Sequence, residues 1–153
     1  MFGIPADLHV YPVLTQDKAK KSQTLAQNLQ ERIAVGLNDE GWRMTPATFP
    51  KVPLKDEIAA LATANGTERV IVLTLNTWYF SINMSLVSDF NFDWGYNLHI
   101  LDAQGTTLAD LTDNGRDVVD TKGSDSYGNQ VNLAYRDRLI KIFERPEVKA
   151  ALQ

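Results

Sequence analysis

The sequence predicts one α/β domain spanning residues 1–153, with the element order βαβαβββα, a mixed sheet and helices on both faces. Three observations predict this fold. The run Val-Ile-Val-Leu-Thr-Leu at 70–75 is apolar without alternation, as in a strand covered on both faces. Apolar and polar residues then alternate over 76–84 and 90–100, which predicts a long antiparallel hairpin with one apolar face. Before the apolar run, strand-like and helix-like patterns take turns, as in parallel α/β units.

The chain begins with a predicted strand and helix. Residues 7–12 alternate between polar and apolar, which predicts a short strand. In the helix that follows, apolar residues recur at four-residue spacing over 25–37 and form one buried stripe. We expect Thr15 or Asp17 to cap the start of this helix, and Gly41 to end it in the left-handed conformation.

A second strand and helix follow. Residues 42–44 predict a short strand that nearby prolines confine to a sheet edge. A second helix is predicted at 54–64, and Asn65-Gly66 ends it. If the strand at 70–75 pairs with the first strand on the side away from the second, right-handed crossovers place the two helices on opposite faces.

The last strand follows a tight turn. Residues 102–105 predict this turn, with a positive φ at Gly105. The strand then runs from Leu108 toward Val118-Val119, and Asn114-Gly115 within it predicts either a bulge or a second turn.

The C-terminal part is predicted to be a loop and a helix. The polar, glycine-containing stretch 120–130 is typical of a surface loop. Its Gly-Ser-Asp-Ser-Tyr-Gly sequence lacks the Gly-Lys-Ser/Thr ending of a phosphate-binding loop. A third helix is predicted at 133–143, followed by a proline break and a short helical turn at 147–152.

Composition excludes several classes of protein. The formal net charge of −4 argues against nucleic acid or an anionic membrane as the main partner. The chain contains no cysteine, which rules out disulfides, thiolate catalysis and cysteine-based metal sites. No run approaches the ~18 apolar residues of a transmembrane helix. Residues 1–5 lack the features of an export signal, so the protein is either cytoplasmic or had such a signal removed before Met1.

The hairpin tip is the predicted contact surface. Its large apolar side chains surround a chain reversal, and no charged residue lies between Arg69 and Asp89. We therefore expect a protein partner or a second copy of the chain to cover it. The predicted interface residues are Trp78, Phe80, Ile82, Met84, Leu86 and Val87.

The polar residues predict no catalytic or metal site, and no cofactor is expected. Five of the aspartates in the second half match no calcium-loop spacing and are interpreted as solvated loop charges: Asp89, Asp93, Asp117, Asp120 and Asp125. His9 and His99 are the only histidines, and two ligands make a poor metal site. No Gly-x-Ser-x-Gly elbow marks a nucleophile.

Four segments, 6–13, 24–42, 62–72 and 139–148, resemble small bacterial envelope lipoproteins whose domain is similar to the amino-terminal domain of the translocation protein TolB. The resemblance spans most of the chain, but it consists of packing patterns and includes no active-site motif. It implies a non-enzymatic accessory or assembly role at the periplasmic or outer-membrane side of the envelope. The family's export signal and lipidated cysteine are not among these residues, which leaves a lipid anchor upstream of Met1 as one possibility.

We therefore expect a non-catalytic, envelope-associated binding or assembly protein. The first alternative is a small enzyme or ligand-binding domain with a pocket between the 76–101 hairpin and the last helix. The second is a cytoplasmic subunit of a complex.

Overall fold

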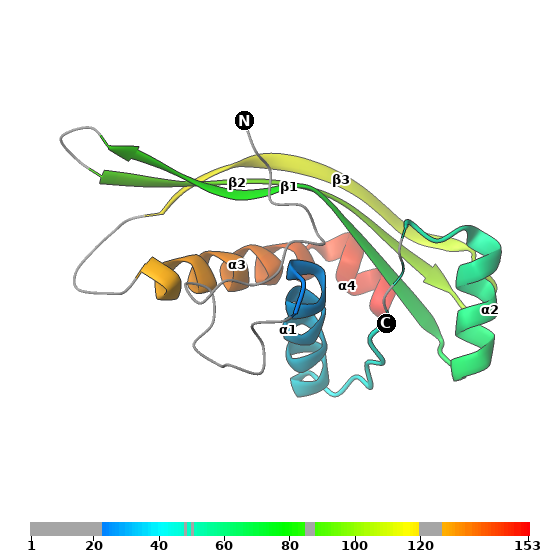
Figure 1. Cartoon of the computed structure of the whole chain (residues 1–153). Helices are drawn as coiled ribbons and strands as arrows, with labels where there is room; N and C mark the ends of the chain where they lie inside the picture. Colours follow the sequence, from blue (N-terminus) through cyan, green and yellow to red (C-terminus); the bar gives the residue numbers. More distant parts are fainter. Residues whose placement is uncertain (1–22, 48, 50, 85–87, 120–126) are drawn as a thin grey trace.

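A computed structural model describes residues 23–47, 49, 51–84, 88–119 and 127–153, with only the backbone for 82–84, 88, 89 and 127. The described elements are α1 (Leu25–Asp39), α2 (Lys55–Asn65), β1 (Arg69–Met84), β2 (Ser88–Asp102), β3 (Thr107–Val119), α3 (Tyr127–Phe143) and α4 (Pro146–Leu152). Three long strands form a curved sheet, with α1, α3 and α4 beneath it and α2 at one end (Figure 1). Helices and strands thus share one α/β architecture, as predicted.

The described sheet is antiparallel throughout, in the order β1-β2-β3. This confirms the long hairpin and the turn after it, where Gly105 has a φ of +81°. The register shifts by one residue between Leu75 and Thr77, so Asn76 forms a bulge in β1. Asn114 and Gly115, by contrast, pair regularly with β2, and the prediction of a bulge or turn there was wrong.

Local capping explains where the first two helices begin and end. Thr24 caps α1 through a capping box with Gln27, so neither Thr15 nor Asp17, which lie outside the described residues, is the cap. Gly41 follows α1 with a φ of +95°, and Gly66 ends α2 with a φ of +60°. Both glycine endings agree with the sequence-based expectation.

The predicted strand at 42–44 is absent, because these residues have no strand conformation. The backbone N–H of Trp42 donates to the carbonyl of Leu37, and that of Met44 donates to the Asn38 side chain. The segment therefore follows the end of α1 instead of joining the sheet. The first predicted strand, 7–12, lies outside the described residues, so its place in a mixed sheet stays a prediction.

Helix α3 begins earlier than predicted, because residues 127–130 are helical and not part of a loop. The rest of the predicted loop, 120–126, lies outside the described residues. The proline break is confirmed, since α4 starts at Pro146 and its first turn needs no N–H from that residue. Arg32 of α1 donates to Asn28 in the same helix and to Asn132 of α3, and the second hydrogen bond ties the two helices together.

The main core lies between the sheet and the helices beneath it. Phe92, Leu98 and Leu29 are buried as predicted. Within β1 the inward residues change parity at the bulge, from Ile71, Leu73 and Leu75 to Trp78 and Phe80. The run at 70–75 and the helix stripe over 25–37 also predict nearly full burial for Val70, Val72, Leu73 and Ile33. These four side chains are only partly buried, so that expectation was wrong.

Helix α2 covers the other face at the end of the sheet. Leu101 follows the inward Ile100, so alternation turns it to the opposite face, yet it is only 3% exposed. Ile58 and Ala62 of α2 are buried as well, and α2 lies on the outer side of the curved strands in Figure 1. Helices therefore flank both faces of the sheet, as predicted.

Candidate functional site

The predicted contact surface lies at the far end of the β1–β2 hairpin. Among the described residues, Phe90 is the last in β2 with a partner in β3, and beyond it β1 and β2 still pair, through Asn83–Asp89 and Met84–Ser88. The hairpin projects past the start of α3 (Figure 1). Leu86 and Val87 lie outside the described residues, and the side chains of Ile82 and Met84 are not described. The backbone thus places Ile82 and Met84 on a projecting arm.

Trp78 does not belong to this surface. Its side chain is fully buried, with ring centroids 5.0 Å from Phe92 and 5.5 Å from Tyr135 of α3. It is therefore core, which corrects the interface prediction for this residue. Phe80 is partly buried and stacks on Phe92 at 4.8 Å. Aromatic rings consequently fill this part of the space between the hairpin and α3, where the alternative prediction expected a pocket.

Polar atoms within this aromatic layer lack partners. In the described part of the chain, Trp78 Nε1, Trp94 Nε1 and the Tyr135 hydroxyl are buried without a hydrogen bond. Burial raises the pKa of Tyr135 well above its usual range, so the phenol stays protonated at neutral pH. A neutral phenol in this place serves packing, and it is not available as a base.

Two aspartates on the inner face of β3 bind arginines, one on either side of Gly115. Asp117 accepts hydrogen bonds from Arg138 of α3, at 3.1 Å from Nε and 2.5 Å from Nη2. The same guanidinium covers the ring of Trp94 at 3.7 Å. Asp117 is thus a paired strand residue, and its interpretation as a solvated loop charge was wrong.

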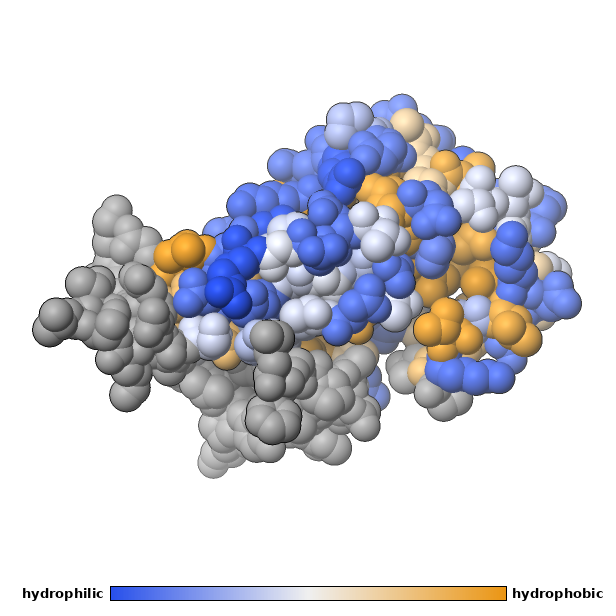
Figure 2. Space-filling model, turned by 90° about the horizontal axis from the view of Figure 1, so that it is seen from above, coloured by the Kyte–Doolittle hydropathy of each residue, from blue (hydrophilic) through white to orange (hydrophobic). Residues whose placement is uncertain are grey.

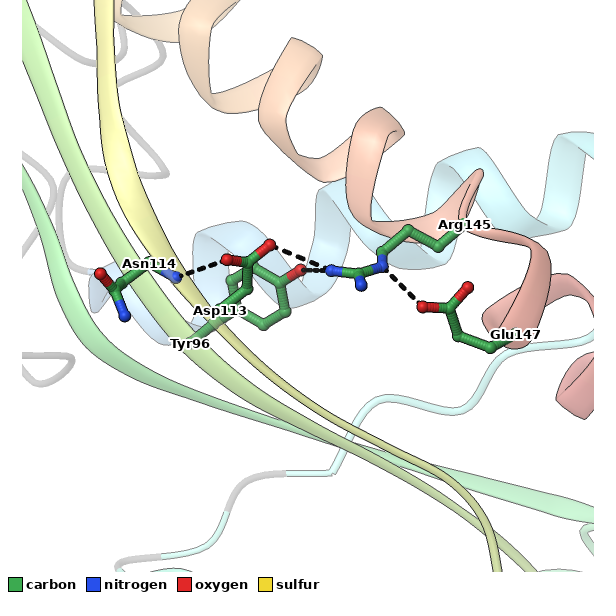
Figure 3. A network of polar contacts seen from close by, with 5 residues as sticks. All are labelled: Tyr96, Asp113, Asn114, Arg145 and Glu147. Carbon is green, nitrogen blue, oxygen red and sulfur yellow. Dashed lines mark hydrogen bonds and ion pairs between the residues drawn. The ribbon is translucent and has the colours of Figure 1, made fainter.

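Asp113 forms the second pair, which Figure 3 shows in full. Its Oδ2 accepts from Arg145 Nη1 at 3.0 Å, and its Oδ1 accepts from the backbone N–H of Asn114. Arg145 also donates to the Tyr96 hydroxyl at 3.3 Å and to Glu147 at 2.9 Å. Because Arg145 is the residue before α4, this network fastens the start of that helix to β2 and β3. The pKa of Glu147 is lowered, chiefly by the backbone N–H of Glu147 itself and also by the neighbouring Arg145.

The outer face of the sheet is mostly polar (Figure 2). Asp93 and Arg116 pair across the strands, with contacts of 2.6 Å and 3.0 Å. The hydrogen bonds from Arg116 lower the pKa of Asp93. Asp93 is therefore also no loop charge, whereas Asp120 and Asp125 lie outside the described residues and the side chain of Asp89 is not described.

His99 lies on the same face, with Nδ1 3.3 Å from Asp110. His9 lies outside the described residues. Within the described residues, no group of three or more His, Asp or Glu side chains is close enough to hold a metal ion. His99 and Asp110 form an exposed cross-strand pair and have no third ligand there.

The second surface feature is an apolar groove of about 410 Å³ along the outer edge of β1. Residues 69–75 form its floor, α1 and α2 form two walls, and residues 43–47, 49 and 51–53 between these helices also line it. The Gln30 side chain donates to the carbonyl of Ala47 and so ties that segment to α1. Figure 2 shows apolar residues around the hollow beside α2. The sequence analysis missed this groove, because it interpreted 70–75 as a central strand.

Comparisons with known proteins identify no family for this chain. No family model matches it, and no curated protein matches it. Among solved structures, the crystal structure of the lipoprotein GNA1162 from Neisseria meningitidis is similar over 77% of this chain and 85% of that chain, with 16% identity and a TM-score of 0.46. No described helix has an apolar stretch that is long enough to cross a membrane.

Proposed function

We propose that this protein is a non-catalytic binding or assembly protein that works through contacts at the tip of the β1–β2 hairpin. The proposed contact residues are Phe80, Ile82, Met84, Leu86 and Val87. Trp78 is not among them, because it is buried in the core. One observation supports this most directly: the two strands continue together past Phe90, the partner of the last described residue of β3.

The sequence of this arm adds to the argument. Solvent-exposed hairpins usually carry charges or prolines near their ends, which prevent association. Here residues 78–88 contain neither, while four of the five proposed contact residues lie within 82–87. An arm that projects with such a sequence is suited to bind a protein partner or a second copy of the chain.

The envelope is the proposed location. This part of the proposal rests on the sequence resemblance of 6–13, 24–42, 62–72 and 139–148 to envelope lipoproteins. On this proposal the protein acts in the periplasm or at the outer membrane, as an accessory component without its own chemistry.

The test is a double substitution, Ile82→Asp with Leu86→Asp. The control is Ser81→Asp with Asn83→Asp, which adds the same charge at positions of the opposite parity on β1. We expect both variants to keep the wild-type circular dichroism and melting curve. Only the first should sediment as a smaller species, or lose an envelope protein that wild type and control retain.

Two outcomes contradict the proposal. Unfolding of the first variant would mean that the tip is part of the intramolecular core. A folded first variant with unchanged mass and unchanged partners would mean that the tip makes no functional contact.

A further inference from the structure

The outer edge of β1 borders the apolar groove. Within the described residues, β1 pairs with β2 on one side and with no strand on the other. Backbone N–H and C=O groups along 69–75 therefore point into the apolar groove. An apolar environment makes unpaired backbone groups costly, and an additional strand is the usual way to satisfy them.

The groove has the form of a slot for such a strand. Helix α1 contributes Leu29 and Ile33 from the main-core side, and α2 contributes Ile58 and Leu61 from the opposite face. Side chains of both helices therefore line the groove beside β1. A strand placed beside β1 would lie between them and be covered on both faces, as strands in α/β layers are.

The burial of β1 leads to the same conclusion. Its apolar run at 70–75 is the pattern of a strand that is covered on both faces, yet Val70, Val72 and Leu73 are only partly buried. Partly buried β-branched and leucine side chains along a free edge favour association with another strand. One more apolar strand beside β1 would complete the burial of these side chains.

We propose that residues 7–13 of the same chain bind in this groove as a fourth strand, parallel to β1. The segment Asp-Leu-His-Val-Tyr-Pro-Val has strand alternation and three aliphatic residues, Leu8, Val10 and Val13. Two helices lie between it and β1 in the sequence, and such a crossover connects parallel strands. Charge is also compatible, because Arg43 and Lys51 line the groove without any acidic residue among the described lining residues, and the segment carries Asp7.

The chain length permits this arrangement. Ten residues, 14–23, separate the segment from Thr24, the cap of α1. Fully extended, they span at most ~36 Å, whereas α1 with 15 residues is ~22 Å long. Because α1 is itself a wall of the groove, the segment can reach either end of it. A tether this short also gives an effective concentration of about millimolar, which favours this segment over a free peptide.

Amide hydrogen exchange in the full chain tests the proposal. A three-stranded sheet protects only the β1 amides that face β2, whereas a fourth strand also protects the outward-facing amides of 69–75. The variant Val10→Pro removes a ladder donor inside the segment. Lys18→Pro, in the connection, is the matched control. We expect at least about a 100-fold faster exchange of the outward amides in Val10→Pro, and wild-type exchange in Lys18→Pro.

A measurement on the wild-type full chain alone covers the case in which Val10→Pro does not fold. The outward-facing amides of 69–75 should then exchange about as slowly as the β1 amides that face β2, and exchange at the rate of unprotected amides would overturn the proposal. Equal exchange in wild type and both proline variants would overturn the proposal. Protection that rises with protein concentration would also overturn it, in favour of a second copy. The hairpin-tip variant should leave this exchange unchanged, so the two proposals fail independently.

Discussion

The indole ring of Trp94 lies over Gly115, its direct partner on the neighbouring strand, and occupies the place of a side chain there. A Cβ atom on Gly115 would be 2.6 Å from Cζ2 of the ring. The ring cannot move away easily, because Arg138 covers it from the other side at 3.7 Å and is itself held by Asp117. The glycine is therefore required by its neighbour and not by its own backbone conformation, since its φ is not positive.

Gly115→Ala should destabilise the protein by about 1–3 kcal/mol, the usual cost of overpacking a rigid site. Gly95→Ala is the matched control, because its nearest neighbours would lie at 3.4–3.6 Å, which is close to ordinary contact. Chemical denaturation measures both differences. A loss of the same size in both variants would show that strand glycines matter here for a reason other than the Trp94 ring.

Phe92 is the central residue of the aromatic layer, fully buried and in ring contact with Trp78, Phe80 and Tyr135. Phe92→Ala should cost about 3–5 kcal/mol, from lost transfer free energy and the cavity that remains. Val118→Ala, at a site that is 67% exposed on β3, should stay within about 0.5 kcal/mol of wild type. A loss below about 1 kcal/mol for Phe92→Ala would contradict the inward orientation of this parity.

The Asp93–Arg116 pair should make stability depend on pH in the acid range. The pKa of Asp93 is lowered in the folded protein from its ordinary value of 3.8, chiefly by hydrogen bonds from Arg116. The contribution of the pair is therefore fully present above pH 3.8 and is lost as the pH falls through the lowered folded-state value.

Asp93→Asn should thus be less stable than wild type at neutral pH, and the difference should shrink at pH values below 3.8. Thermal melting at several pH values measures this. Arg116→Gln should show the same pattern, because it removes the other half of the pair. A difference that is the same at pH 7 and pH 3 would mean that the carboxylate of Asp93 contributes nothing through its charge.

The sequence was most informative where a single residue decides the local structure. Gly41, Gly66 and Gly105 each take a positive φ at a predicted ending or turn. Alternation over 90–100 correctly assigned Phe92 and Leu98 to the core. These features depend on near neighbours in the chain, and a pattern can therefore predict them.

The errors concern contacts between residues that are far apart in the chain. Asp117 lies shortly before the polar stretch 120–130, a position that predicts a loop charge, but Arg138, 21 positions later, pairs with it. The local pattern around Trp78 predicts a place at the hairpin tip. The contact of its ring with Tyr135 of α3 does not follow from any local pattern. Residues 42–44 have strand-like side chains, yet hydrogen bonds to the end of α1 hold them outside the sheet.

The bulge at Asn76 shifts by one residue the alternation that decides which β1 side chains face the core. Before it, the odd-numbered residues Ile71, Leu73 and Leu75 face the core, and after it the even-numbered Trp78 and Phe80 do. A change of one residue in length has opposite outcomes here. Deleting Asn76 would join Leu75 to Thr77 in a regular ladder and keep Trp78 and Phe80 on the core side, whereas one more inserted residue without a second bulge would turn every later β1 side chain to the opposite face.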